Sequence, residues 1–154
     1  MKVVSNSSPL ILLSAIGMLD LLKNEFGELL IPEAVYDEVT SRELKGSDEV
    51  KHAGWIKVLS IKNNQALFFL PSLDRGEEEA IVLAIEHDAD LVLLDDLAGR
   101  RAAMMQGLNV MGTLGFLKVM QRKSRIKKFK DVLDDIQKNG FWMSADLYNR
   151  MLDE

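Results

Sequence analysis

The chain has 154 residues and 47% hydrophobic content, which suits one domain with a proper core, so we expect a single domain over residues 1–154. It has no cysteine and only two histidines, which excludes disulfides, thiolate sites and cysteine nucleophiles and leaves oxygen atoms as the ligands for any metal. The net charge of −5 argues against a general nucleic-acid coat protein.

The amino-terminal segment predicts a strand at residues 2–5, then a tight turn and a helix over residues 10–21. Ser7 or Ser8 is the expected N-cap of that helix. Asn6 is therefore expected at the carboxyl end of the first strand. The apolar run is broken by polar residues and lacks a cleavage site, so we expect a cytoplasmic protein without a signal peptide or a membrane span.

A second strand is predicted at residues 29–31, and a proline begins the helix over residues 32–44. Val35 and Val39 mark the buried side of this helix, and Glu38 lies next to them. Taken alone, Glu38 is more simply interpreted as a solvated charge on a helix face. Further along, residues 56–61 alternate apolar and polar side chains, which is typical of a strand near the edge of a sheet.

The stretch Leu73–Ala103 predicts an acidic helix, a wholly apolar strand at residues 91–94 and a second helix over residues 97–106. A strand without polar positions is expected to be covered on both faces, as in a parallel sheet between helices. Asp95 and Asp96 follow it, at the edge where ligands bind in open α/β sheets. By itself this pair is equally well explained as a turn that caps the next helix.

Asp74 or Gly76 is the expected cap of the acidic helix, which carries Glu77, Glu78 and Glu79 in its first turn, where carboxylates favour the helix dipole. Its centre is apolar around nearly the whole circumference, which predicts a helix buried between layers. The narrow polar sector that remains holds Glu79.

The last third of the chain predicts a short strand at residues 109–111 and helices over residues 112–120, 131–138 and 144–152. Residues 118–130, from the end of the first of these helices to the start of the second, form a basic cluster without acidic residues, which is the candidate surface for RNA phosphates. A solvated surface that offsets the acidic remainder explains it equally well. The cluster consists of Lys118, Arg122, Lys123, Arg125, Lys127, Lys128 and Lys130.

Polar side chains that follow or flank the predicted strands form one candidate site. Hard divalent cations need several oxygen ligands, and Mg²⁺ or Mn²⁺ held there activates water and offsets phosphodiester charge. This candidate site consists of Asn6, Glu38, Glu79, Asp95 and Asp96.

Five segments in this order carry a resemblance to a known family: VVSNSSPLILL, IPEAVYDEV, LDRGEEEAIVLA, LVLLDDLAGRRAA and GLNVMGTLGFL. The chain resembles the PIN-domain superfamily over nearly its whole length, and within it the prokaryotic branch related to VapC-type toxins. The resemblance implies a three-layer α/β/α fold with a short, mostly parallel central sheet. It also implies a ribonuclease that depends on Mg²⁺ or Mn²⁺, with RNA as substrate, an antitoxin protein as partner and a homodimer as the assembly.

The resemblance also assigns roles to single residues. The four acidic positions of the family fall on Asn6, Glu38, Glu79 and Asp96, of which the last three are the expected catalytic acids. Glu77 and Asp95 are additional acids that share the metal, Ser7 and Ser8 are the hydroxyls beside the first position, and Arg100 lies at the rim.

The first of these positions departs from the family, in which it is usually aspartate. The amide of Asn6 offers an oxygen but no negative charge, which weakens the attraction for a cation. The alternative is therefore a catalytically weakened PIN-like domain that binds RNA or protein. A phosphoacceptor receiver domain ranks last, because its acidic pair is expected after the first strand.

Overall fold

The computed structural model describes residues 1–41, 46–69 and 73–153. Five strands form its sheet: β1 (Val3–Ser5), β2 (Leu29–Pro32), β3 (Ile56–Leu59), β4 (Leu91–Leu93) and β5 (Val110–Met111). Their order is β3-β2-β1-β4-β5, and every pairing among them is parallel. The edge position predicted for residues 56–61 is confirmed for β3.

Nine α-helices and one 3-10 helix lie within the described residues. They are α1 (Ser7–Ala15), α2 (Asp20–Phe26), α3 (Glu33–Ser41), α4 (Ser47–His52), α5 (Arg75–Glu86), α6 (Leu97–Met105), α7 (Thr113–Arg122), α8 (Phe129–Lys138), α9 (Ala145–Asp153) and the 3-10 helix η1 (Asn64–Phe69). The last three residues of the helix predicted over 32–44 lie outside the described residues.

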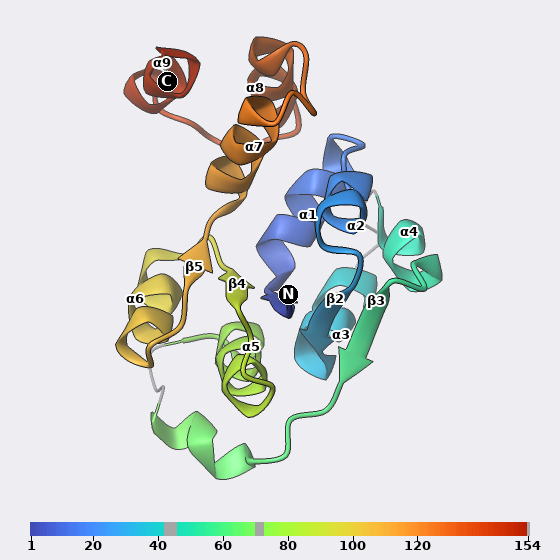
Figure 1. Ribbon diagram of the computed structural model, residues 1–154, viewed down its shortest axis with the longest axis vertical. Helices are drawn as coiled ribbons and strands as arrows, with labels where there is room; N and C mark the ends of the chain where they lie inside the picture. Colours follow the sequence, from blue (N-terminus) through green and yellow to red (C-terminus); the bar gives the residue numbers. More distant parts are fainter. Residues whose placement is uncertain (42–45, 70–72, 154) are drawn as a thin grey trace.

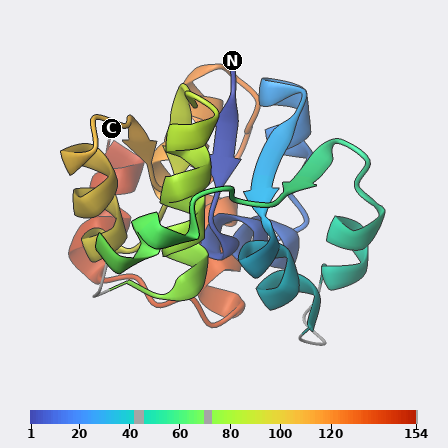
Figure 2. The same ribbon diagram turned by 90° about the horizontal axis from the view of Figure 1, so that it is seen from below.

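Alternation along the strands builds two separate apolar cores. Val3, Leu91 and Leu93 face a core shared with α1, α2, α7, α8 and α9, whereas Val4 and Val92 face a core shared with α5 and α6. Figures 1 and 2 show the sheet between these two helical layers. The predicted three-layer α/β/α fold is therefore confirmed, as is the strand covered on both faces, because all three residues of β4 are buried.

Three local predictions need correction. The helix predicted over residues 10–21 is two helices, because α1 ends at Ala15 and Gly17 has a φ of +71°, which ordinary side chains rarely adopt. The N-cap of α1 is Asn6 instead of a serine, and its side chain makes no capping hydrogen bond. The helix predicted over residues 97–106 ends one residue early, at Met105. Within the described residues, none of the helices has both the length and the apolarity to cross a membrane.

Candidate functional site

The carboxyl ends of β1 and β4 meet at one edge of the sheet. Val4 pairs with Val92 and Ser5 with Leu93, and the backbone N–H of Asn6 donates a hydrogen bond of 3.0 Å to the carbonyl of Leu93. Residues that follow the two strands are thus neighbours although some ninety positions separate them in the sequence. The helices α5 and α6 also begin at this edge of the sheet.

Asn6 contributes a buried acceptor that no group in the chain satisfies. Its side chain is 4% exposed, and Oδ1 is among the buried side-chain atoms without a hydrogen-bond partner in the described part of the chain. A Cβ atom placed on Gly76 would lie 3.2 Å from this oxygen and 3.3 Å from Oε2 of Glu38. The two oxygens therefore face the same small space, which Gly76 leaves open.

Glu38 is held in place by its helix and by a serine. The neighbours Val35 and Val39 are buried in the core, which fixes the face of α3 that Glu38 flanks. The hydroxyl of Ser7 donates a hydrogen bond of 2.7 Å to Oε2 of Glu38. The structure thus brings together Asn6, Ser7 and Glu38, whereas Ser8 is exposed and lines a different cavity.

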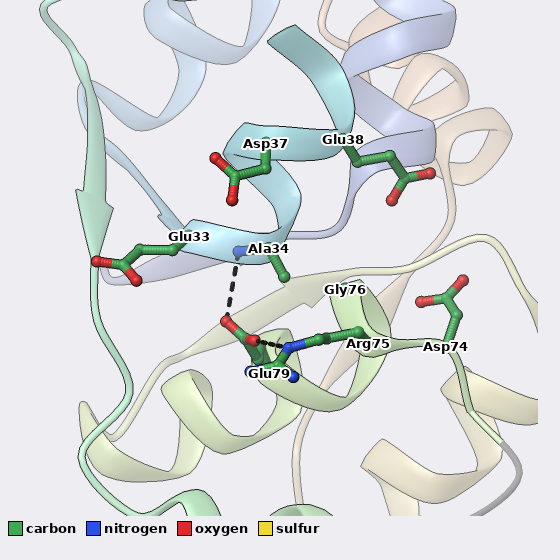
Figure 3. A pocket seen from close by; sticks show the side chains of 8 residues that line it. All are labelled: Glu33, Ala34, Asp37, Glu38, Asp74, Arg75, Gly76 and Glu79. Atoms are coloured by element: carbon green, nitrogen blue, oxygen red, sulfur yellow. Dashed lines mark hydrogen bonds and ion pairs between the residues drawn. The ribbon is translucent and has the colours of Figure 1, made fainter. Parts of the chain in front are cut away.

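Glu79 is turned away from these residues. One oxygen of its carboxylate accepts the backbone N–H of Ala34 at 3.3 Å, and the other accepts Nε of Arg75 at 2.7 Å. Figure 3 shows this pair on one side of a pocket of about 650 Å³, with Glu38 and Asp74 directed to the other side. An acid already paired with arginine is a poor third ligand beside Asn6 and Glu38.

Glu77 lies on nearly the opposite side of α5 from Glu79. Successive residues turn by about 100° around a helix, so side chains two positions apart face nearly opposite directions. Glu77 is buried, and its carboxylate lies against the first turn of α6, where a Cβ atom on Gly99 would be 3.4 Å from Oε2. Burial, followed by the negative charges of Asp74 and Asp96, raises the pKa of Glu77 to about 7.

A sequence signal could have distinguished the two glutamates. Asp74 is the N-cap of α5 and accepts the backbone N–H of Glu77 at 2.8 Å. An N-cap residue followed three positions later by glutamate is the spacing of a capping box, which places Glu77 beside the start of the helix. Asp74 therefore lies beside Glu77, although it was not among the site residues predicted from the sequence.

The adjacent aspartates after β4 diverge. Asp95 accepts the N–H and the hydroxyl of Thr113, both at 2.6 Å, and so caps α7. Asp96 caps α6 by accepting the N–H of Gly99 at 3.1 Å, and its side chain is exposed. Of these two aspartates, Asp96 is the one whose negative charge raises the pKa of Glu77. Asp96 therefore lies near Glu77, whereas Asp95 is bound to Thr113.

The resulting acidic group has the chemistry of a divalent-cation site. In the described ranges no three Asp, Glu or His side chains lie close enough to hold a metal as they stand. Nevertheless, Oδ1 of Asn6 lacks a hydrogen-bond donor, and the charged neighbours that act on the carboxyl of Glu77 are both acidic. A bound cation would supply a partner to each of these groups. A donor set made wholly of oxygens suits Mg²⁺ or Mn²⁺. The group comprises Asn6, Glu38, Asp74, Glu77 and Asp96.

The basic cluster lies away from the acidic group. Lys118 is buried, donates a hydrogen bond of 2.5 Å to the carbonyl of Met151 and lies 5.0 Å from the ring centre of Phe129, so its role is structural. Lys123 pairs with Glu25, which precedes β2, and the segment between α7 and α8 lies at the edge where the strands begin (Figure 2). The remaining predicted phosphate-binding residues are exposed there: Arg122, Arg125, Lys127 and Lys128.

Comparisons with known proteins agree on the fold. A family model described as PIN domain matches residues 2–154. Among solved structures, the chain is similar to a PilT N-terminus domain protein from the hyperthermophilic archaeon Sulfolobus solfataricus, with a TM-score of 0.53 and 15% identity over 94% of this chain and 98% of that one. No curated protein matches the chain.

Proposed function

Because the chain belongs to the PIN-domain family, whose fold commonly forms metal-dependent nucleases, we propose that it is an endoribonuclease that uses Mg²⁺ or Mn²⁺ to cleave RNA phosphodiester bonds. The observation that carries the proposal is the unpartnered Oδ1 of Asn6, which faces the same space as the carboxylate of Glu38. A buried polar atom without a partner is costly and calls for an explanation, and a bound cation supplies one.

Asn6, Glu38, Glu77 and Asp96 would hold the cation. The ion would supply a water of lowered pKa and positive charge against the phosphodiester. Ser7 fixes the orientation of Glu38 through its hydrogen bond, and Asp74 fixes the first turn of α5 and thereby Glu77. In this proposal Glu77 replaces Glu79 as the third acid, and Glu79 has the positioning role of anchoring Arg75 against α3.

A catalytically weakened domain that binds RNA or protein is the second candidate. The observation that favours it is the identity of Asn6, because an amide ligand brings no charge to the cation. If Asn6→Asp creates cleavage in a parent that does not cleave, the chain is the weakened form. If the parent cleaves and loses that activity in Glu38→Gln, the chain is the enzyme.

The narrower role proposed from the resemblance is that of a VapC-type toxin with an antitoxin protein and a second copy of the chain as partners. A toxin of this kind arrests growth when expressed alone, and co-expression of a neighbouring antitoxin gene restores growth. Normal growth on expression of an active ribonuclease would remove the toxin role and leave the enzymatic one standing.

The enzymatic proposal is tested with a labelled single-stranded RNA and the purified chain in EDTA, Mg²⁺ or Mn²⁺. Cleavage is expected only with metal. Glu38→Gln, Glu77→Gln and Asp96→Asn are expected to lose roughly 10- to 100-fold or more of it. Glu78→Gln makes the same change of charge on the neighbouring residue of α5 and is the matched control. Cleavage in EDTA, or equal losses in Glu78→Gln and Glu77→Gln, would contradict the proposal.

A further inference from the structure

A second cavity, of about 430 Å³, lies beside the acidic group. Its wall is formed by the residues that follow β4 and β5, by α1, α6 and the first turn of α7, and by α8 with the segment that joins it to α9. The residues that give it its character are Ser8, Asp95, Arg100, Thr113, Phe141 and Trp142.

One side of this cavity carries a positive charge. A Cβ atom placed on Gly112 would lie 3.2 Å from Nη1 of Arg100 and 3.1 Å from Oδ1 of Asp95, so Gly112 keeps the space beside the guanidinium open. The carboxylate of Asp95 is taken up by the two hydrogen bonds from Thr113. No ion pair engages Arg100 within the parts of the chain that the structure describes. Its guanidinium can therefore contact a phosphate group.

The other side carries an aromatic ring held out in solvent. Trp142 is 88% exposed, although both of its neighbours are anchored. Phe141 packs against the larger core, Met143 is buried, and the carbonyl of Met143 accepts a hydrogen bond from the side chain of Gln137. The indole is thus carried on a fixed segment of backbone. Single exposed apolar residues are common, but this one lines a cavity that also holds an arginine and hydroxyl groups.

We propose that this cavity receives one unpaired nucleotide of the RNA strand that crosses the acidic group, with Trp142 stacked on the base and Arg100 on the adjoining phosphate. An exposed indole stacks on any base, whereas a paired base keeps its faces inside the duplex. The site therefore selects single-stranded RNA. The inference rests on the proposed function for the identity of its ligand, although the stacking itself needs no cleavage.

The fluorescence of Trp142 reports directly on this contact. Trp55, the only other tryptophan, is changed to phenylalanine, so that all indole emission comes from Trp142. A short single-stranded RNA is titrated in EDTA, where metal-dependent cleavage does not occur. Quenching is expected with the single strand and not with the duplex of the same sequence. In a separate assay with labelled RNA, Trp142→Ala is expected to weaken binding roughly 5- to 100-fold, and Trp142→Phe to restore most of it.

Met105→Ala on α6 is the matched control, because Met105 is 85% exposed and does not line the cavity. Equal quenching by duplex, or unchanged RNA binding in Trp142→Ala, would overturn the inference even if the chain cleaves RNA. Quenching by single strands in a chain that cleaves nothing with any metal would support the subsite and reject the enzymatic proposal. Quenching by a co-purified protein with none by RNA would overturn it in favour of a protein partner.

Discussion

Asn6→Asp should make the stability of the site depend on a bound cation, because it adds a second negative charge beside Glu38. The oxygens of Asn6 and Glu38 each lie within 3.3 Å of one point, so they are at most about 6.6 Å apart. Two carboxylates at that separation repel by about 2.5 kcal/mol at an effective dielectric constant of about 20. For a domain of this size, that loss corresponds to a fall in Tm of roughly 5–10 °C.

Thermal unfolding at pH 8 tests this estimate, first in EDTA and then in millimolar Mn²⁺. The variant is expected to unfold at the lower temperature in EDTA and to gain more from Mn²⁺ than the parent, because the new charge repels Glu38 and attracts the ion. Asn149→Asp, an exposed change of the same kind on α9, should stay within about 0.5 kcal/mol of the parent in both buffers. Equal Tm values for Asn6→Asp and its parent in EDTA, with equal gains from Mn²⁺, would refute the shared acidic space.

Three further predictions concern other residues of the site and the core. Gly76→Ala should reduce metal-dependent cleavage at least tenfold, because its methyl group fills the space between the oxygens of Asn6 and Glu38. Gly115→Ala in α7 is the control, because a Cβ atom there would lie 3.6 Å from its nearest neighbour, and it should keep activity and raise the free energy of unfolding in urea by up to about 1 kcal/mol. Glu77 has a folded pKa of about 7, above its ordinary 4.5, so its contribution to stability is fully present below pH 4.5 and is lost as the pH rises to 7. Urea unfolding in EDTA should therefore show a decline with pH that Glu77→Gln lacks, and parallel curves would contradict the assignment. Lys118→Met should lower the free energy of unfolding by about 1–3 kcal/mol by leaving a carbonyl of α9 without its donor, against less than about 0.5 kcal/mol for the exposed Arg122→Met.

The sheet was predictable because the pattern of apolar and polar side chains along a strand indicates which of its faces are buried. The apolar run at residues 91–94 predicts burial on both faces, and the alternation at residues 56–61 predicts an edge, and both hold in β4 and β3. Helix breaks were harder to locate. The apolar spacing continues through Gly17, although residues 16–19 separate α1 from α2 and Gly17 among them has a positive φ.

The site was only partly predictable, because charge and spacing alone do not show which way a side chain turns. Asn6 and Glu38 come together as expected, since the edge of a parallel sheet gathers the residues that follow its strands. Glu79 differs from Glu77 through the hydrogen bond that it accepts from the backbone N–H of Ala34, and that contact depends on where α3 packs against α5. Lys118 counted as a surface charge in the sequence because the helix that covers it, α9, lies more than twenty residues further on.

The position of β1 in the middle of the sheet has a consequence for the newly synthesised chain. β1 is made first, but its partner β4 emerges only after residue 91, and Asn6 needs the carbonyl of Leu93 to be fixed in place. Loop closure over such a separation makes this pairing a late event in folding. A ribosome-bound or truncated chain that stops before β4 therefore contains Asn6, Glu38, Asp74 and Glu77 but lacks Asp96 and the strand that fixes Asn6 in place. For a chain proposed to cut RNA, the order of synthesis therefore delays the assembly of the site until β4 has been made.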